Sequence, residues 1–228
     1  MKKNVLITGA TGNLGKATVD RFRSDGYNII ATTTPGKGSA FDDKDIITYE
    51  VDLANETETG KVISDIVKKY QTIDAALLLV GGFAPGKVED ADLSQINSMI
   101  TLNFNTAYAV ARPVFIQMKK QNGGRIILVG SKPGLMAEHG KDYLSYALSK
   151  SLIFRLAEYF NADGAKHNVV ASVIVPGTID TPANRKAMPD ANFANWVSPE
   201  EIAATMAFLC SDESKSLRDP VIKIFGKS

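Results

Sequence analysis

The sequence predicts an α/β fold in which a doubly wound parallel sheet carries helices on both faces. Short apolar, β-branched runs alternate with helical patterns along the whole chain, as in right-handed strand–helix–strand units. The run 73–80 is apolar almost throughout, which is typical of a strand covered on both faces. No linker, repeat or low-complexity segment divides the 228 residues, so we expect a single domain spanning 1–228.

The expected elements follow one another in regular order. The first strand, 4–8, ends in glycine, and the residues after it carry a helical pattern with one apolar side. A long helical pattern covers 93–119, in which Pro113 predicts a kink or a break, and Ser198 is the N-cap candidate of the last helix. The further strands are expected at 27–34, 46–51, 73–80, 125–129, 168–175 and 221–225, and the further helices at 14–23, 56–70 and 143–160.

Composition excludes several classes of partner and site. Lysine and arginine number 26 against 25 aspartate and glutamate, so no net field recruits nucleic acid or an anionic membrane. No segment approaches the roughly 18 apolar residues of a membrane span. Cys210 is the only cysteine, which excludes an intrachain disulfide and a multi-cysteine metal site. We expect a cytoplasmic protein without a metal, whose partner is a small molecule.

The segment TGATGNLG at 8–15 places glycines at positions 9, 12 and 15 between the first strand and the first helix. A tight turn there lets backbone amides approach a pyrophosphate at the helix N-terminus, where larger side chains would block it. Because the loop stands between a strand and a helix, we interpret it as a dinucleotide-binding loop, with a plain turn as the alternative.

Polar residues at two strand ends bear on the choice of dinucleotide. A site for NAD(H) usually has an acid at the end of the second strand, where this chain has Thr33. An uncharged residue removes the repulsion that an acid exerts on a 2′-phosphate, and Lys16 and Lys37 are near enough in sequence to pair with one. We therefore expect NADP(H) in preference to NAD(H). Asp52 either accepts a hydrogen bond from the adenine amino group or caps a turn.

Tyr146 and Lys150 stand four residues apart in an expected helix, so the phenol and the ammonium share one face. A nearby cation favours the phenolate and would lower the pKa of Tyr146 from about 10 towards neutral pH, where the phenol serves in acid–base chemistry. Taken alone, the pair also fits a solvated helix face. Ser131 alone would be a turn serine at a strand end, and Asn103 alone a satisfied buried amide.

In combination and in this order, the motifs resemble the short-chain dehydrogenase/reductase family over nearly the whole chain. They are TGATGNLG at 8–15, Asp52, TLNFNTAY around Asn103, Ser131 after a strand, YALSK at 146–150 and PGTIDT at 176–181. The resemblance implies a single-domain Rossmann fold in which Ser131 holds the substrate oxygen beside Tyr146, which gives or takes the proton. Lys150 would lower the tyrosine pKa and bind the nicotinamide ribose, and Asn103 would hold a water that links Lys150 to solvent.

The resemblance also implies the cofactor contacts. Besides Tyr146 and Lys150 they come from the glycine loop, the strand ends and the segment that covers the nicotinamide: Gly9, Thr11, Gly12, Asn13, Leu14, Gly15, Thr33, Asp52, Leu53, Gly81, Pro176, Gly177, Ile179 and Thr181. One departure concerns the motif Asn-Asn-Ala-Gly that often follows the fourth strand in the family. This chain has LVGG at 79–82, so support for the central strand must come from elsewhere.

Two segments more narrowly resemble the dihydropteridine reductase branch, which reduces a quinonoid pterin: 180–196 and 80–86. That branch lacks the serine of position 131 and prefers NADH, whereas this chain has Ser131 and Thr33. In the substrate loop, about 178–198, we expect Phe193 and Trp196 to pack the lid.

The first hypothesis is therefore a short-chain dehydrogenase/reductase that transfers a hydride between NAD(P)H and a small carbonyl or alcohol substrate, with Tyr146 as general acid/base. The alternatives are a pterin reductase and a non-catalytic dinucleotide-sensing Rossmann protein, which has no need of the four catalytic candidates. The resemblance also implies a homodimer or homotetramer built from the helices at 93–119 and 143–160. The second helix has more apolar positions than one buried stripe needs, which is compatible with an interface on its outer face: Leu152, Ile153, Leu156 and Phe160.

Overall fold

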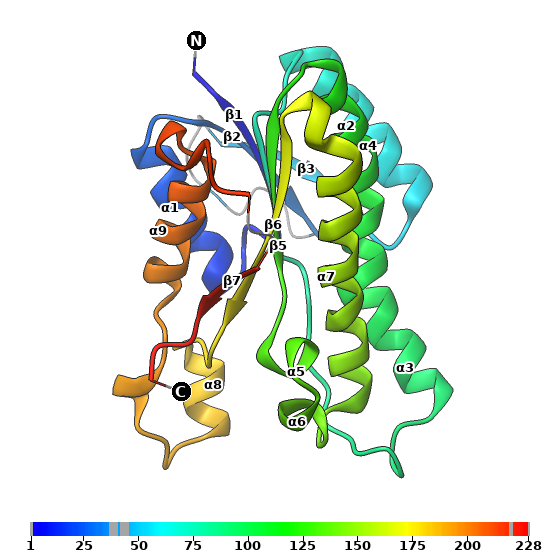
Figure 1. Cartoon of the computed structure of the whole chain (residues 1–228), viewed down its shortest axis with the longest axis vertical. Coiled ribbons are helices and arrows are strands. Elements are labelled where there is room, and N and C mark those ends of the chain that lie inside the picture. The colour runs from blue at the N-terminus through cyan, green and yellow to red at the C-terminus, as the bar shows by residue number, and fades with distance from the viewer. Residues whose placement is uncertain (1, 37–40, 42–45, 219–220, 228) are drawn as a thin grey trace.

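A parallel sheet forms the centre of the molecule. The computed structural model describes residues 2–36, 41, 46–218 and 221–227, and within them seven parallel strands pair in the order β3-β2-β1-β4-β5-β6-β7 (Figure 1). The strands are β1 Asn4–Thr8, β2 Asn28–Thr33, β3 Ile46–Glu50, β4 Ala75–Leu78, β5 Gly124–Val129, β6 Val169–Pro176 and β7 Val221–Ile224. The predicted doubly wound α/β fold is thus confirmed.

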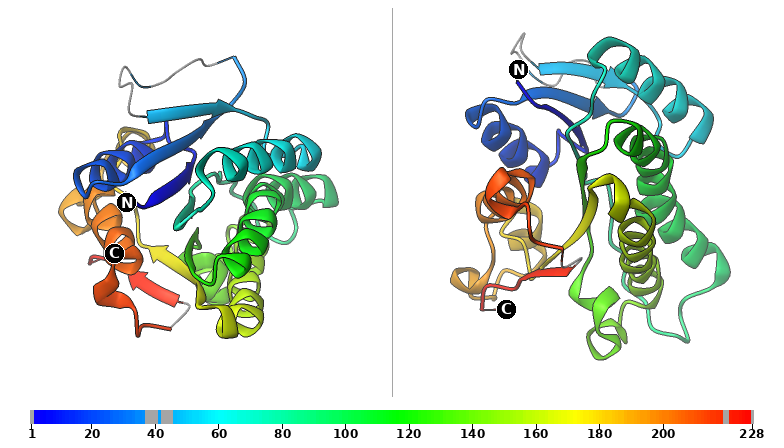
Figure 2. Two further views of the ribbon diagram at one scale, coloured as in Figure 1. Left: turned by 90° about the horizontal axis from the view of Figure 1, so that it is seen from above. Right: turned by 45° about the horizontal axis from the view of Figure 1, so that its top comes forward.

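Helices cover both faces of this sheet (Figures 1 and 2). On one face α1 and α9 pack against each other, and on the other face lie α2, α4 and α7. The helices are α1 Asn13–Ser24, α2 Glu56–Tyr70, α3 Leu93–Ile100, α4 Thr106–Lys120, α5 Lys132–Leu135, α6 Ala137–Gly140, α7 Leu144–Gly164, α8 Pro182–Ala187 and α9 Pro199–Cys210. Among the described residues, none of the helices has both the length and the apolar character needed to cross a bilayer.

Two apolar cores explain why the central strands are continuous hydrophobic runs. Leu6 of β1 packs in the core beneath α2, α4 and α7, whereas its neighbours Val5 and Ile7 pack in the core beneath α1 and α9. Successive side chains of a strand point to opposite faces, so both sets must be apolar when both faces are covered. Each buried side chain of this size contributes about 1.5–3 kcal/mol.

The strand order reverses direction at β1. This strand pairs in parallel with β2 on one side and with β4 on the other, in the registers Val5 to Ile29 and Val5 to Ala75. Chain segments leaving the carboxyl ends of such neighbouring strands turn to opposite faces and leave a crevice between them. The polar residues singled out above follow these strand ends.

Of the kink or break expected at Pro113, the break is wrong. Pro113 lies inside α4, which continues through it, and the interruption is a π-helical turn at Thr101–Asn105 between α3 and α4. Proline removes one backbone hydrogen bond, but Val110 and Val114 beside it are fully buried and hold the helix in the core. The π-helical turn has a tertiary cause, because it contains Asn103, whose side chain is bound on two sides by other segments.

Most of the apolar residues at 143–160 that were expected to lie at an interface between copies are buried in the core of one chain. Ile153, Leu156 and Phe160 of α7 are buried within one copy of the chain, and Phe160 stacks on Phe115 of α4 with ring centroids 4.5 Å apart. Only Leu152 of the four residues expected to be in surplus is exposed. A helix that packs on both the sheet and a neighbouring helix needs a wider apolar face than one stripe, which is why the pattern overstated the surplus.

Candidate active site

The glycine loop after β1 is shaped for a bound phosphate. Gly9 has a φ of +64°, and a Cβ at Gly15 would lie 2.1 Å from the Gly9 carbonyl oxygen, so neither position tolerates a side chain. The Gly12 N–H donates to the Gly9 carbonyl at 3.0 Å, which closes the turn. Helix α1 begins directly after Gly12, which offers no capping side chain. Its first N–H groups are therefore donors for an anion at the helix N-terminus.

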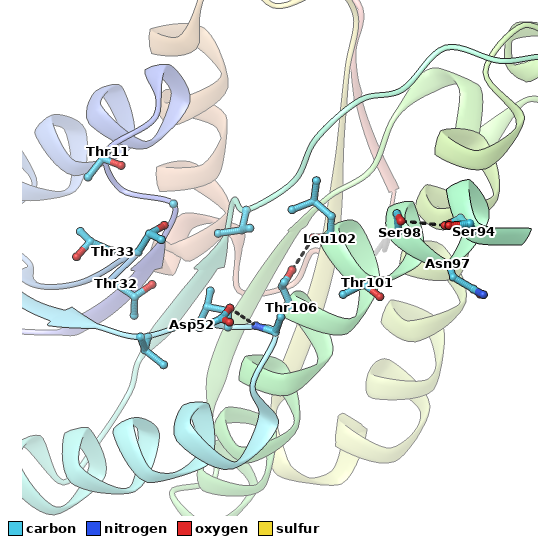
Figure 3. A pocket seen from close by; sticks show the side chains of 16 residues that line it. Thr11, Thr32, Thr33, Asp52, Ser94, Asn97, Ser98, Thr101, Leu102 and Thr106 are labelled. Carbon is cyan, nitrogen blue, oxygen red and sulfur yellow. Dashed lines mark hydrogen bonds between the residues drawn. The ribbon is translucent and has the colours of Figure 1, made fainter. Parts of the chain in front are cut away.

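A cleft of about 790 Å³ opens beside this loop. Figure 3 shows Thr11, Thr33 and Asp52 on one side of it and residues of α3 on the other. Of the expected cofactor contacts, Gly9, Thr11, Thr33, Asp52 and Leu53 line the cleft. The other lining residues were not predicted from the sequence: Thr32, Thr34, Val51, Ala54, Val80, Ser94, Asn97, Ser98, Thr101, Leu102 and Thr106.

Thr33 ends β2 and lines the cleft. This residue is buried, and among the described residues its hydroxyl has no hydrogen-bond partner, as is also true of the hydroxyls of Thr48, Thr59 and Tyr70. Asp52 has the turn role, because its carboxylate accepts the Ala54 N–H at 3.0 Å, while it also faces the cleft. Lys16 is exposed on α1, and Lys37 lies outside the described residues.

Ser131, Tyr146 and Lys150 meet at the carboxyl end of β5. Ser131 follows this strand, its hydroxyl accepts the Gly134 N–H at 3.1 Å, and it lies near enough to Tyr146 to act on the pKa of the phenol. Lys150, one turn further along α7, is buried and donates from Nζ to the Val129 carbonyl at 2.8 Å. The end of β5 and the helix α7 thus bring together three of the four catalytic candidates.

Asn103 reaches the same place from the π-helical turn. Its buried side chain accepts the Gly82 N–H at 2.9 Å and donates to the Gly82 carbonyl at 3.1 Å and to the Ser149 hydroxyl at 3.0 Å. Gly81 lies between the two functional groups, since a Cβ there would stand 2.7 Å from Asn103 Oδ1 and 3.2 Å from Lys150 Nζ. These bonds support the strand end that lacks the asparagines of the usual motif, together with a bond from the Leu79 N–H to the Thr8 hydroxyl at 3.0 Å.

Burial dominates the electrostatics of the site. It lowers the pKa of Lys150 to about 8. Burial also raises the pKa of Tyr146, and the hydrogen bond with Ser131 lowers it by less. The expected depression of the tyrosine pKa by Lys150 is therefore not seen, because the ammonium is turned to the Val129 carbonyl and loss of hydration is the larger effect.

The segment 178–198, expected to be the substrate loop, is held in place by several contacts. Ile179 pairs with Val197, and the Gly177 N–H donates to the Ile224 carbonyl at 2.8 Å. Arg185 binds Asp180 through two hydrogen bonds of 2.6 and 2.7 Å and lies 4.8 Å above the Phe193 ring. The Phe193 and Trp196 ring centroids are 4.7 Å apart, so these two residues pack against each other within the segment. Thr181 caps α8 by accepting the Asn184 N–H at 3.2 Å.

These features define a dinucleotide-binding fold with a Ser-Tyr-Lys group at the carboxyl end of β5, and the comparison with known families agrees. The family model for short chain dehydrogenase matches residues 3–192, so the chain belongs to the short-chain dehydrogenase family. Its relatives in this family are reductases and dehydrogenases acting on CH–OH and C=O groups. The chain is accordingly an oxidoreductase that depends on a nicotinamide dinucleotide.

Individual relatives match over almost their whole length. An acetoacetyl-CoA reductase from Acinetobacter sp. (strain RA3849) is 26% identical over 242 residues, which cover 99% of this chain and 97% of that protein. A dihydropteridine reductase from Dictyostelium discoideum is 29% identical over 236 residues, which cover 100% of this chain and 96% of the relative. Among solved structures, NADP-bound ElxO has a TM-score of 0.89 at 23% identity, covering 99% of this chain and 98% of its own, which shows the shared fold.

Replacing Gly81 by alanine tests the packing between Asn103 and Lys150. The added Cβ would meet Asn103 Oδ1 and Lys150 Nζ, so both must shift. A displacement of about 1 Å in a catalytic group can cost about 100-fold in rate, and we expect a loss of this order in kcat/KM for the best substrate of a carbonyl panel. Gly60→Ala in α2 is the control, because its Cβ would have no heavy atom within 4 Å. Wild-type kcat/KM in Gly81→Ala would show that the close packing does not matter.

Proposed function

We propose that Asn103, Ser131, Tyr146 and Lys150 are the catalytic group of a reductase that uses NADPH to convert a small carbonyl compound into an alcohol. The observation that carries the proposal is the convergence at the carboxyl end of β5, where Ser131 acts on the pKa of Tyr146 and the buried Lys150 packs beside Gly81. A dinucleotide-sensing protein without catalysis has no need of this group. The presence of these four residues therefore favours an enzyme that oxidises or reduces the bound dinucleotide.

Each residue of the group has a role in the proton transfer. When bound, the nicotinamide supplies the hydride to the carbonyl carbon. Tyr146 donates its phenolic proton to the carbonyl oxygen, so that C=O becomes CH–OH and the phenol becomes a phenolate. Ser131 donates a hydrogen bond that holds the same oxygen beside the phenol. In the direction of oxidation, the phenolate takes the proton back from the alcohol.

Lys150 stabilises the phenolate as it forms. A cation in a dry site acts strongly on a negative charge that develops near it, and the buried Lys150 ammonium donates a hydrogen bond to a neutral carbonyl, that of Val129. Asn103 fixes the Gly81–Gly82 backbone against this ammonium and, through a bound water, would link it to solvent. Lys150 would thus stabilise the phenolate, and the water held by Asn103 would connect the same site to solvent protons.

For the cofactor we propose NADP(H) in preference to NAD(H). The end of β2 has no acid, and the buried Thr33 hydroxyl, without a partner in the described part of the chain, would bind the ribose 2′-substituent. Gly9, Thr11, Gly12, Asn13, Leu14 and Gly15 would hold the pyrophosphate, with Asp52 and Leu53 at the adenine and Gly81 along the ribose. Pro176, Gly177, Ile179 and Thr181 would cover the nicotinamide, in one domain whose loop 178–198 closes over the substrate.

A second candidate function is the reduction of a quinonoid pterin. It is favoured by the 29% identity to a dihydropteridine reductase along the whole chain. Ser131 and Thr33 are the departures from that branch. Oxidation of NADH and NADPH in the presence of quinonoid dihydropterin, measured beside the carbonyl panel, decides between the two substrates.

We also propose a homodimer or homotetramer in the cytoplasm. Exposed Tyr108, Ile116 and Tyr159 of α4 and α7 line a groove of about 680 Å³, and α7 also exposes Leu152; a second copy of the chain would cover this apolar surface. Cys210 is free and buried, which fits a reducing compartment.

Tyr146→Phe removes the proton donor and keeps the ring. Because general acid catalysis contributes about 10²- to 10⁴-fold, kcat for carbonyl reduction should fall by this factor while NADPH still binds. The assays are NADPH oxidation across aldehydes, ketones and quinones, and fluorescence titration of NADPH. Tyr159→Phe, an exposed tyrosine on the same helix, is the control. Undiminished turnover in Tyr146→Phe would refute the mechanism.

The charge of Lys150 predicts a pH dependence. With a pKa of about 8, the ammonium is charged below that pH and neutral above it, whereas the raised pKa keeps the Tyr146 phenol protonated throughout this range. The rate of carbonyl reduction at saturating NADPH should therefore decline as the pH rises through about 8. Lys150→Met should be slow and lack this decline, and Lys120→Met, at an exposed position, should keep it. A wild-type profile that is flat to about pH 10, the usual tyrosine range, would contradict this role.

Thr33→Asp places an acid where the 2′-phosphate would bind. Since like charges in contact cost several kcal/mol, the Kd for NADPH should rise at least about tenfold while the Kd for NADH does not. Thr33→Val keeps the shape without the charge and should show a smaller loss. Fluorescence titration with both dinucleotides measures the effect. Equal changes in both affinities would exclude Thr33 from the 2′-site.

A further inference from the structure

An exposed aromatic ring stands directly beside Tyr146. Phe83, in the loop after β4, is 58% exposed. Its ring centroid lies 5.1 Å from that of Tyr146 in an edge-to-face arrangement and 5.1 Å from that of Tyr143. The three rings form an apolar wall next to the group that donates the proton.

The backbone on both sides of Phe83 is fixed. On one side, Asn103 binds both polar groups of the Gly82 backbone. On the other side, Gly86 pairs with the start of α7, through the Gly86 N–H to the Asp142 carbonyl at 3.0 Å and the Leu144 N–H to the Gly86 carbonyl at 2.8 Å.

A side chain of α3 adds a third attachment to this loop. Gln95 donates to the Pro85 carbonyl at 3.1 Å and accepts from the buried Ser145 hydroxyl at 3.3 Å. The ring is therefore carried on a backbone held at three places. A fixed position is what a ring needs if it is to select a ligand rather than move aside.

The exposure of Phe83 does not by itself indicate a binding role, because single apolar residues on a protein surface are common. Phe208 on α9, for example, is 45% exposed and lies on the face of the sheet away from α7. What distinguishes Phe83 is its contact with the Tyr146 ring. A substrate whose carbonyl oxygen is hydrogen-bonded by the Tyr146 hydroxyl is bound at the same side chain whose ring Phe83 contacts.

We propose that Phe83 is a specificity-determining residue which favours substrates that carry a flat, conjugated ring next to the reacting carbonyl. This inference rests on the proposed role of Tyr146 as proton donor. Aromatic rings associate at centroid distances of 4.5–7 Å with a gain that corresponds to about 2- to 13-fold in an equilibrium constant. A saturated ring of the same size fills the space but gains no ring–ring contact.

Two pairs of small molecules separate these cases. Benzaldehyde and cyclohexanecarbaldehyde are compared as substrates with NADPH, and the measured quantity is the ratio of their kcat/KM values in each variant relative to wild type. This double ratio cancels the different intrinsic reactivities of the aldehydes. Benzyl alcohol and cyclohexylmethanol are compared by calorimetric Kd on the Tyr146→Phe enzyme bound to NADP⁺, where a loss of turnover leaves binding measurable.

Phe83→Leu keeps apolar bulk and removes the aromatic ring. We expect it to lower the benzaldehyde preference about 3- to 10-fold and to lower the preference for benzyl alcohol in Kd by a similar factor. Phe208→Leu should leave both ratios unchanged, and Phe83→Trp should retain them. NADPH affinity should be the same in all variants.

The proposal is overturned if Phe83→Leu changes both members of a pair equally, or if neither alcohol binds. These outcomes leave the proposed function standing, provided that Tyr146→Phe abolishes turnover of carbonyl substrates. Conversely, turnover that survives in Tyr146→Phe refutes the proposed function, and the Kd ratios then report on Phe83 by themselves.

Discussion

The hydrogen bonds of the Asn103 side chain hold together the segments on which the site depends. The loop after β4 contains Gly81 and Gly82, which have no side chains of their own to fix the backbone. Asn103 binds Gly82 on both its N–H and its carbonyl and extends the connection to Ser149 on α7. A buried amide left without these partners would cost about 1–3 kcal/mol for each lost bond, so the three segments are fixed relative to one another. The π-helical turn is the local distortion that brings Asn103 into this position.

Within this frame, loss of hydration sets the properties of the ionisable groups. Burial disfavours the charged forms of both Lys150 and Tyr146, and a single serine hydrogen bond works in the opposite direction on the phenol. A neutral phenol is the form needed to donate a proton, and a lysine with a lowered pKa can change its charge near physiological pH. Groups that are ready to change protonation state are typical of acid–base sites.

Local rules predicted the features that depend on neighbouring residues in sequence. The bounds of α2 and the glycine loop follow from caps, periodicity and the need for a tight turn, and the residues Ser131, Tyr146 and Lys150 were brought together as expected. The helix break predicted at Pro113 does not occur, because the burial of the neighbouring helix residues outweighs the tendency of proline to interrupt a helix. Ser94, Asn97, Ser98 and Thr101 repeat at helical spacing, but a polar stripe facing a cleft has the same pattern as one facing solvent. The direction of the Tyr146 pKa shift depends on burial, which no spacing reveals.

The central position of β1 has a consequence for the way the chain folds. The Asn4 N–H is bound by the carboxylate of Asp74, 70 positions away, and β1 lies between β2 and β4 in the finished sheet. Pairing over such separations requires the closure of long loops and slows folding. Until β4 docks, β1 presents an unpaired apolar edge, the kind of surface that chaperones bind and that aggregates form on. Gly9 packs against the backbone of Val80, so the dinucleotide loop reaches its final shape only after that late pairing.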